Sequence, residues 1–156
     1  MSPSINSGVS QVSSQRPSFD QIYMRLAQAM SERSTCARLQ VGCVIASDDF
    51  RRVYAVGYNG GAAGAKNGCD VTGPEAVGLC GCIHAESNAI INCSADREKN
   101  KIVYCTDLPC LMCAKMLVNL GGVKTVYFGR TYRKLEGQAL LQSLGICVEQ
   151  LKDVAQ

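Results

Sequence analysis

A chain of 156 residues with 47% hydrophobic and 19% charged side chains has the composition of a globular protein that buries its own core. The net charge of +3, from 16 basic and 13 acidic residues, is too small to indicate a groove for a long nucleic acid. No apolar run approaches the length of a membrane span. These values predict one compact domain that does not associate with a membrane.

The first 17 residues are rich in serine and glutamine and predict a disordered tail, so we expect the domain over residues 18–156. This tail has no apolar core of the signal-peptide kind, and we therefore expect a cytoplasmic protein. After the tail, Ser18 and Gln21 have the spacing of a capping box, and apolar residues then recur at helical spacing through about Glu32. This pattern predicts a first helix with one buried face.

Two β-rich runs follow, over residues 40–46 and 52–58, and the turn between them predicts a β-hairpin. Glycine and alanine dominate between Asn59 and Leu79, which predicts a long loop of the kind that carries function or is held by other groups. The elements expected after the loop are a helix over 84–93, a strand over 101–105, a helix over 109–120, a strand over 123–128, a helix over 135–144 and a strand over 146–151.

The expected order is thus one helix, two strands, and then helices and strands in alternation. Strand–helix–strand units require parallel crossovers, so at least part of the sheet must be parallel. The order therefore predicts an α/β protein, a three-layer α/β/α sandwich built on a five-stranded mixed sheet.

Three residues that zinc favours stand near the starts of two of these helices. His84, the only histidine, opens the helix over 84–93, and Cys110 and Cys113 lie in the first turn of the helix over 109–120. Unpaired backbone N–H groups and the helix dipole lower thiol pKa values there, which suits metal ligation. One histidine and two cysteines leave the fourth position of a catalytic zinc to water, and the H-x-E and P-C-x-x-C spacing is typical of zinc nucleobase deaminases.

Glu86, two residues after His84, is expected to move protons and not to bind the metal. Zinc lowers the pKa of a bound water from 15.7 to about 7, so that hydroxide can attack an electron-poor ring carbon. Glu86 would carry the proton to the ring nitrogen and then to the leaving amino group, which departs as ammonia. The alternative is a structural zinc with a fourth thiolate ligand, which gives Glu86 no role.

Several other segments accompany these motifs, and from about residue 18 to residue 147 the chain resembles the deoxycytidylate (dCMP) deaminase branch of the cytidine deaminase superfamily. The matching segments are residues 33–38 (RSTCAR), 41–42 (VG), 57–60 (GYNG), 84–90 (HAESNAI), 109–115 (PCLMCAK) and 132–133 (YR). The resemblance implies a cytidine deaminase-like fold, a zinc cofactor, and hydrolysis of dCMP, or of a 5-substituted dCMP, to dUMP and ammonia.

The same resemblance implies a homo-oligomer, which in this family is often a hexamer and is often regulated by dCTP and dTTP. Residues 61–64 lack the proline that is often found there in nucleotide-regulated members, so regulation stays open.

The family pattern assigns His84, Cys110 and Cys113 to the catalytic zinc and Glu86 to proton transfer. The substrate-binding residues that it implies are Asn59 at the sugar, Tyr132 near the base, Ala85, and Ser34, Arg38 and Arg133 at the 5′-phosphate. An arginine fork binds phosphate through two hydrogen bonds, and a neighbouring hydroxyl adds a donor. Two other basic residues, Arg130 and Lys134, are interpreted as surface charge.

Four more cysteines stand where some members of the family bind a second, structural zinc: Cys36, Cys69, Cys80 and Cys82. A four-thiolate zinc would tie the long loop to the end of the first helix. The alternative is that some of the four are small buried apolar side chains. That is our interpretation of the remaining cysteines, Cys43, Cys93, Cys105 and Cys147.

Other functions are compatible with the zinc motif. A deaminase of a base in single-stranded nucleic acid would need a basic, aromatic groove, whereas this chain has no tryptophan and three phenylalanines. A deaminase of another free nucleotide, or a zinc protein without catalytic activity, would also keep the metal. We prefer the dCMP deaminase because the residues expected to bind phosphate accompany the zinc motif.

Overall fold

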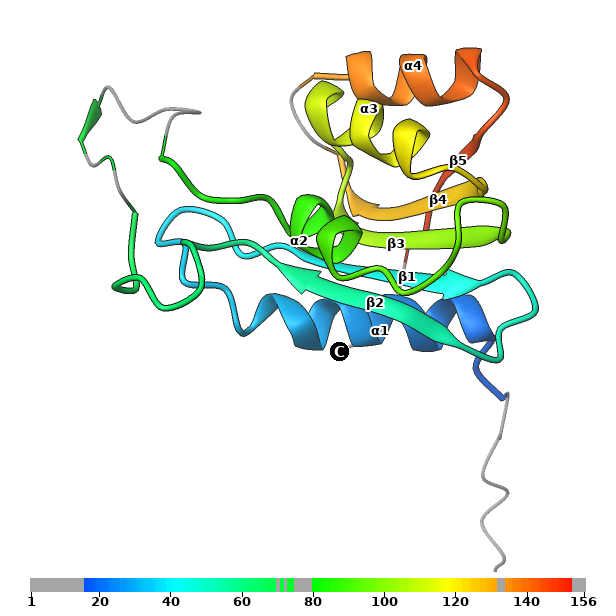
Figure 1. Cartoon of the computed structure of the whole chain (residues 1–156), viewed down its shortest axis with the longest axis horizontal. Coiled ribbons are helices and arrows are strands. Elements are labelled where there is room, and N and C mark those ends of the chain that lie inside the picture. The colour runs from blue at the N-terminus through cyan, green and yellow to red at the C-terminus, as the bar shows by residue number, and fades with distance from the viewer. Residues whose placement is uncertain (1–15, 70, 72, 75–79, 132–133, 153–156) are drawn as a thin grey trace, which may run out of the picture.

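The computed structural model describes residues 16–69, 71, 73–74, 80–131 and 134–152 (Figure 1). The helices and strands follow the predicted order, and their ends lie within a few residues of the predicted ones. In chain order they are α1 (Phe19–Ser31), β1 (Gly42–Ser47), β2 (Val53–Tyr58), α2 (Ala85–Ile91), β3 (Lys101–Asp107), α3 (Leu111–Leu120), β4 (Val123–Arg130), α4 (Glu136–Ser143) and β5 (Cys147–Gln150).

The strands form one mixed sheet in the order β2-β1-β3-β4-β5. β1 pairs antiparallel with β2 and with β3, whereas the β3–β4 and β4–β5 pairs are parallel. α3 and α4 make the two crossovers between the parallel strands. The predicted five-stranded mixed sheet is confirmed, and the carboxyl ends of β3 and β4 lie beside each other at one edge of the molecule.

Two hydrophobic cores lie on opposite faces of the sheet. Alternate residues of a strand point to opposite faces, so Val44 and Ala46 pack with α1, whereas Cys43 and Ile45 pack with residues of α2, α3 and α4. α1 covers β1, β2 and β3 on its face, and the other three helices lie on the far side of the sheet (Figure 1). The predicted three-layer α/β/α sandwich is therefore confirmed.

The predicted capping box opens α1. The hydroxyl of Ser18 accepts a hydrogen bond from the backbone N–H of Gln21 at 3.2 Å, and the Gln21 side chain accepts one from the Ser18 N–H at 2.9 Å. Further along, the hydroxyl of Tyr104 in β3 donates to the Asp20 carboxylate at 2.7 Å. These contacts fix α1 on the sheet, and the chain after α1 then runs along the edge where β3 and β4 end.

A buried lysine opens β3. Lys101 has no exposed surface, and its ammonium donates to the carbonyl oxygens of Asp96 at 2.7 Å, Lys99 at 2.8 Å and Gly121 at 3.1 Å. Burial lowers the pKa of Lys101. The ammonium therefore joins the loop before β3 to the carboxyl end of α3, the end opposite Cys110.

Most of the predicted tail, its first 15 residues, lies outside the described residues. Residues 16–17 precede α1 without regular structure. No helix in the described part of the chain has both the length and the apolar composition needed to cross a membrane.

Substituting Gly57 by alanine should destabilise the protein. A Cβ at Gly57 in β2 would overlap the carbonyl oxygen of Ala85 and lie 2.6 Å from the amide nitrogen of Ala89. α2 would have to move away from the sheet, and we expect Gly57→Ala to lower the free energy of unfolding by about 3 kcal/mol in urea titrations.

The matched control is Gly61→Ala, because the nearest atom to a Cβ at Gly61 is the carbonyl oxygen of Lys66 at 3.9 Å. We expect this variant to change the free energy of unfolding by less than about 1 kcal/mol. Equal free energies of unfolding for the two variants would show that α2 can move away from β2 without loss of stability.

Candidate functional site

The three predicted zinc ligands meet where α2 and α3 begin. His84 and Cys110 are the N-cap residues of these helices, and Cys113 lies in the first turn of α3. Nδ1 of His84 is 3.6 Å from Sγ of Cys110 and 3.4 Å from Sγ of Cys113. Tetrahedral zinc bonds of about 2.3 Å to sulfur and about 2.0 Å to nitrogen place the two ligand atoms about 3.5 Å apart. The triad therefore has the donor types and the spacing that zinc requires.

The three ligand side chains hold their protons unequally. The Cys113 thiol, followed by the His84 ring, lowers the pKa of Cys110 to about 3. The hydrogen bond to Cys110 in turn raises the pKa of His84 to about 9, and it also raises the pKa of Cys113. At neutral pH the triad is thus a Cys110 thiolate beside an imidazolium and a thiol, a cation-binding arrangement once the two protons leave.

Glu86 lies in the first turn of α2 and is only 4% exposed. Burial raises the pKa of its carboxyl group to about 6, although the nearby His84 lowers it in part. A carboxyl group with a pKa close to neutrality can both accept and donate a proton at physiological pH.

A cavity of about 530 Å³ is lined by Glu86 and by two members of the zinc triad, His84 and Cys110. This volume is in the range of small-molecule sites. His84, Ala85 and Glu86 line one side, and the chain between α1 and β1 lines another through Arg38, Leu39 and Val41. The cavity also reaches Asn59 and the ends of β3 and β4.

The structure brings together some of the predicted substrate residues. Arg38, Asn59 and Ala85 line the cavity, as the family pattern leads one to expect. Ser34 is not among the described lining residues, and its hydroxyl accepts a hydrogen bond from the N–H of Cys36 at 3.2 Å. Tyr132 and Arg133 lie outside the described residues.

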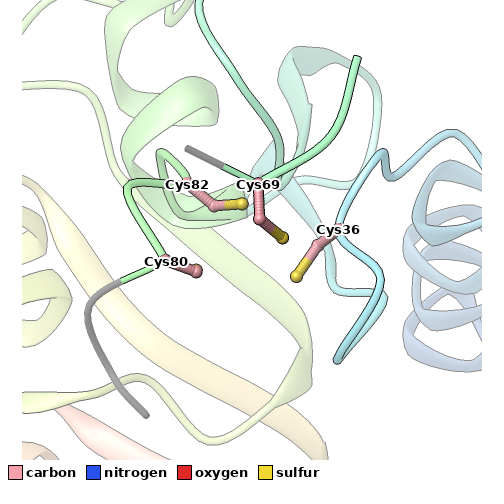
Figure 2. A group of neighbouring side chains, drawn as sticks. All are labelled: Cys36, Cys69, Cys80 and Cys82. Carbon is pink, nitrogen blue, oxygen red and sulfur yellow. The ribbon is translucent and has the colours of Figure 1, made fainter. Parts of the chain in front are cut away.

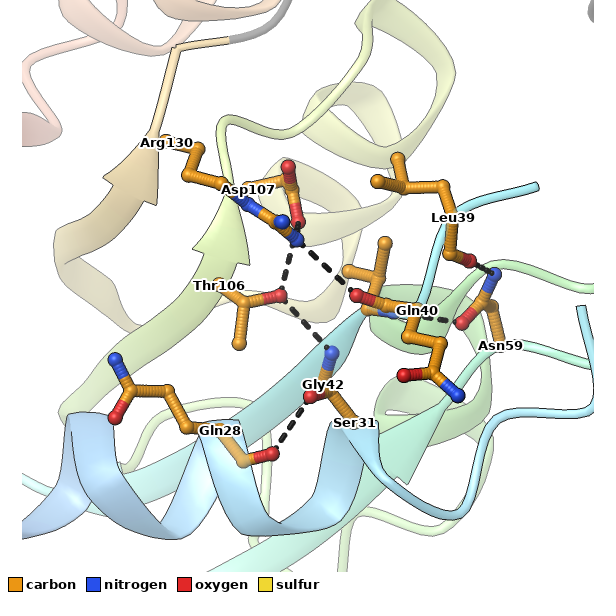
Figure 3. A network of polar contacts seen from close by, with 10 residues as sticks. Gln28, Ser31, Leu39, Gln40, Gly42, Asn59, Thr106, Asp107 and Arg130 are labelled. Carbon is orange, nitrogen blue, oxygen red and sulfur yellow. Dashed lines mark hydrogen bonds and ion pairs between the residues drawn. The ribbon is translucent and has the colours of Figure 1, made fainter. Parts of the chain in front are cut away.

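Asn59 holds the wall of the cavity in place. Its side-chain oxygen accepts a hydrogen bond from the N–H of Val41 at 2.8 Å, and its amide nitrogen donates to the carbonyl oxygen of Leu39 at 2.7 Å (Figure 3). One amide hydrogen and one lone pair remain for a further partner. Asn59 can therefore shape the cavity and also contact a ligand in it.

The four cysteines predicted for a second metal form one cluster. Figure 2 shows them converging from the chain after α1, from the long loop and from the segment before α2; all four sulfur atoms lie within 4.8 Å of one another. Burial raises the pKa of Cys36, but backbone N–H groups of Leu39 and Arg38 and the neighbouring thiols outweigh it, so that the net shift is downward. The structure thus brings together the four cysteines that the sequence singled out for a second metal.

The other cysteines divide into two groups. Cys43 and Cys105 are fully buried, with sulfur atoms 3.6 Å apart on neighbouring strands, as predicted for small apolar side chains, and Cys93 is half-buried. For Cys147 the prediction is wrong. It is exposed because it lies on the outer strand β5, where its thiol contacts Glu149 at 3.1 Å.

Two residues that the sequence did not assign to the site, Asp107 and Arg130, also line the cavity. Arg130 is exposed, but it is not an isolated surface charge, because its Nη2 donates to Oδ2 of Asp107 at 2.7 Å and to the carbonyl oxygen of Gln40 at 3.2 Å. The two residues are register partners at the ends of the parallel strands β3 and β4. Both residues could have been identified from the sequence by their position at the carboxyl ends of predicted parallel strands, where ligands tend to bind.

Deoxycytidylate deaminases of two yeasts are similar in sequence to this chain. The deoxycytidylate deaminase of Schizosaccharomyces pombe is 36% identical over 146 residues, which are 86% of this chain and 44% of that protein. The deoxycytidylate deaminase of Saccharomyces cerevisiae is 35% identical over 144 residues, 86% of this chain and 45% of that protein. The chain thus spans less than half the length of these two relatives.

Solved structures show the same fold. The crystal structure of the dCMP deaminase of cyanophage S-TIM5, in complex with dCMP and dUMP, matches with a TM-score of 0.74 and 32% identity over 87% of this chain and 98% of that chain. Residues 17–130 also match the family model described as the cytidine and deoxycytidylate deaminase zinc-binding region. This match covers the triad, Glu86 and both sides of the cavity, and the chain belongs to the cytidine and deoxycytidylate deaminase family.

Proposed function

We propose that this protein catalyses the zinc-dependent hydrolytic deamination of dCMP, or of a 5-substituted dCMP, to the uracil nucleotide and ammonia. The observation that carries the proposal is one cavity lined by the buried carboxyl group of Glu86, by two members of the zinc-binding triad and by two arginines. The names of the two yeast relatives, and the dCMP and dUMP bound to the cyanophage enzyme, support this choice of substrate.

His84, Cys110 and Cys113 would hold the catalytic zinc, because their donor atoms and spacing fit it. Bound there, zinc would supply a nucleophile at neutral pH by lowering the pKa of a water ligand to about 7. The start of α3 directs a backbone N–H group towards a ligand sulfur, since the N–H of Cys113 donates to Sγ of Cys110 at 3.5 Å.

Glu86 would transfer the protons. As a carboxylate it accepts the proton of the attacking water and delivers it to the ring nitrogen, which makes the adjacent carbon electrophilic. It would then take the remaining proton of that water from the new hydroxyl group on the ring carbon and give it to the amino group, which leaves as ammonia while the carbonyl forms. Its burial in the cavity wall keeps bulk water away from the carboxyl group, and its raised pKa of about 6 suits both steps.

The rest of the cavity would orient the nucleotide. Asn59 has an amide hydrogen available for a sugar hydroxyl, and Ala85 at the start of α2 would contact the base beside Glu86. Arg38 would bind the 5′-phosphate. The corresponding roles of Ser34, Tyr132 and Arg133 stay predictions.

A Glu86→Gln variant should separate catalysis from metal binding. Glutamine keeps the shape of the side chain but cannot take up the water proton. We therefore expect an unchanged zinc content and a fall in kcat of about a thousandfold for ammonia release from dCMP. The wild-type enzyme, assayed in parallel on dCMP and deoxycytidine, should prefer the nucleotide.

Each rival function has its own outcome in these assays. A kcat/KM for deoxycytidine equal to that for dCMP would contradict the phosphate assignment. A wild-type protein that holds zinc but releases no ammonia from any pyrimidine nucleotide would favour a non-catalytic zinc protein. A salt-sensitive gel shift with single-stranded DNA would favour a nucleic-acid substrate.

We also propose a second, structural zinc on the four-cysteine cluster, since four thiols within 4.8 Å of one another form a closed zinc site. A Cys69→Ser variant should then lose one of two zinc ions in mass-spectrometric metal analysis and unfold at a lower temperature. Cys147→Ser is the matched control, because Cys147 is exposed and outside the cluster. One zinc ion per wild-type chain would refute the second site.

Zinc binding to the catalytic triad should strengthen as pH rises. His84, with a pKa raised to about 9, and the Cys113 thiol both have to lose a proton before they can bind the metal. The apparent zinc affinity of Cys69→Ser protein should therefore rise by about tenfold or more per pH unit from pH 6 to 8. Competition with a chromophoric chelator measures this, and a flat profile would mean that neither His84 nor Cys113 carries a proton in the metal-free protein.

We further propose that the protein is a cytoplasmic homo-oligomer. Large apolar side chains are exposed on and beside α2, α3 and α4, namely Ile91, Leu111, Met112, Leu135 and Leu144. Apolar side chains gathered on one side of a protein are typical of subunit contacts. All ten cysteines are free thiols, which suits a reducing compartment. Hexamer formation and regulation by dCTP and dTTP stay predictions.

A further inference from the structure

Side chains from three strand ends hold the cavity wall between Leu39 and Gly42 (Figure 3). Asn59, after β2, binds Leu39 and Val41, as described above. From the end of β3, the hydroxyl of Thr106 accepts a hydrogen bond from the N–H of Gly42 at 3.1 Å. From the end of β4, Arg130 donates to the carbonyl oxygen of Gln40 at 3.2 Å. The wall next to Arg38 is therefore fixed in position.

Asp107 is the anchor of this network. Its carboxylate is largely buried, and Oδ2 accepts hydrogen bonds from Nη2 of Arg130 at 2.7 Å and from the Thr106 hydroxyl at 3.0 Å. A buried carboxylate needs such a partner, since an unpaired charge there is costly. The side chain of Arg130 is nevertheless 60% exposed. Asp107 thus holds Nη2 of the guanidinium and leaves Nε and Nη1 without a recorded contact in the described part of the chain.

Nε and Nη1 of Arg130 carry further hydrogen-bond donors. A guanidinium has five N–H groups, and the recorded contacts of Arg130 in the described part of the chain all involve Nη2. The N–H groups of Nε and Nη1 therefore remain for a ligand. Both bidentate forks of a guanidinium include Nη2, so these N–H groups bind phosphate oxygens one at a time. Arg130 lines the cavity together with Arg38, which places both cations on the same ligand space.

We propose that Arg130, positioned by Asp107, binds the phosphate of the substrate and makes the enzyme select nucleotides over nucleosides. The inference rests on the proposed deaminase function and adds a residue that the family pattern does not assign. Asp107 is a positioning residue: it compensates the charge of the bound arginine and removes most of the freedom that an exposed side chain would otherwise lose on binding.

The test is the ratio of kcat/KM for dCMP to kcat/KM for deoxycytidine, measured with zinc-loaded enzyme. Arg130→Gln should lower this ratio by about 10- to 100-fold, the effect of losing a charged hydrogen-bond pair. Arg130→Lys keeps the charge but loses the N–H groups of Nε and Nη1, and should lower the ratio less. The matched control is Arg51→Gln, in the exposed turn between β1 and β2, which should leave the ratio unchanged.

A different result is expected if Arg130 only holds the cavity wall and does not bind phosphate. In that case the two Arg130 variants would lose the same factor on both substrates, the ratio would stay at the wild-type value, and the inference would be overturned.

Binding measurements separate this inference from the proposed reaction. Calorimetric titration of zinc-loaded Glu86→Gln protein with dCMP requires no turnover. Adding Arg130→Gln should raise the Kd for dCMP by about 10- to 100-fold relative to the Kd for deoxycytidine. An unchanged Kd ratio would overturn the role of Arg130 even if the wild type deaminates dCMP, whereas a raised ratio would support it even if turnover is absent.

Discussion

His84 and Cys110 come from helices that follow different strands, yet their ligand atoms must lie 3.6 Å apart for one metal ion to reach both. This requirement fixes where α2 and α3 begin. α2 meets it by packing directly on the glycine backbone of β2, and α3 by leaving β3 through the short segment Leu108-Pro109. The sheet order, the close approach at Gly57 and the position of Glu86 all depend on that convergence.

The same arrangement sorts the charges of the site. The helix start that stabilises the Cys110 thiolate also brings that thiolate against His84, whose pKa rises as a result. Glu86 is buried in the first turn of α2, and it therefore keeps a proton to higher pH than an exposed carboxyl group would. Metal binding would displace the protons of His84 and Cys113, whereas Glu86, with a pKa of about 6, can take up and release a proton near neutral pH. The start of α2 thus separates metal binding from proton transfer.

Most of the fold and the centre of the site could be predicted from local sequence patterns. Helical periodicity, the capping box at Ser18 and the alternation of strands and helices predicted the elements in order. The zinc triad was predictable because its ligands are fixed relative to helix starts. What could not be predicted depends on strand register. Only the pairing of β3 with β4 brings Asp107 to Arg130, and only the outer position of β5 exposes Cys147. Asn59 was expected at the sugar, but its bonds to Leu39 and Val41 arise from the packing of β2 beside β1.

Lys101 has a further effect on the life of the chain before it folds. The residues after it, Ile102-Val103-Tyr104-Cys105, form a short uncharged β-prone run that is wholly buried in the native sheet. Such runs associate with one another while they are exposed, and a charged neighbour opposes this. In the unfolded chain the ammonium of Lys101 is a hydrated charge at the head of that run, and on folding it donates hydrogen bonds to four backbone carbonyl groups. The charge of Lys101 thereby opposes association of the central strand before folding, and the same side chain lies in the protein interior afterwards.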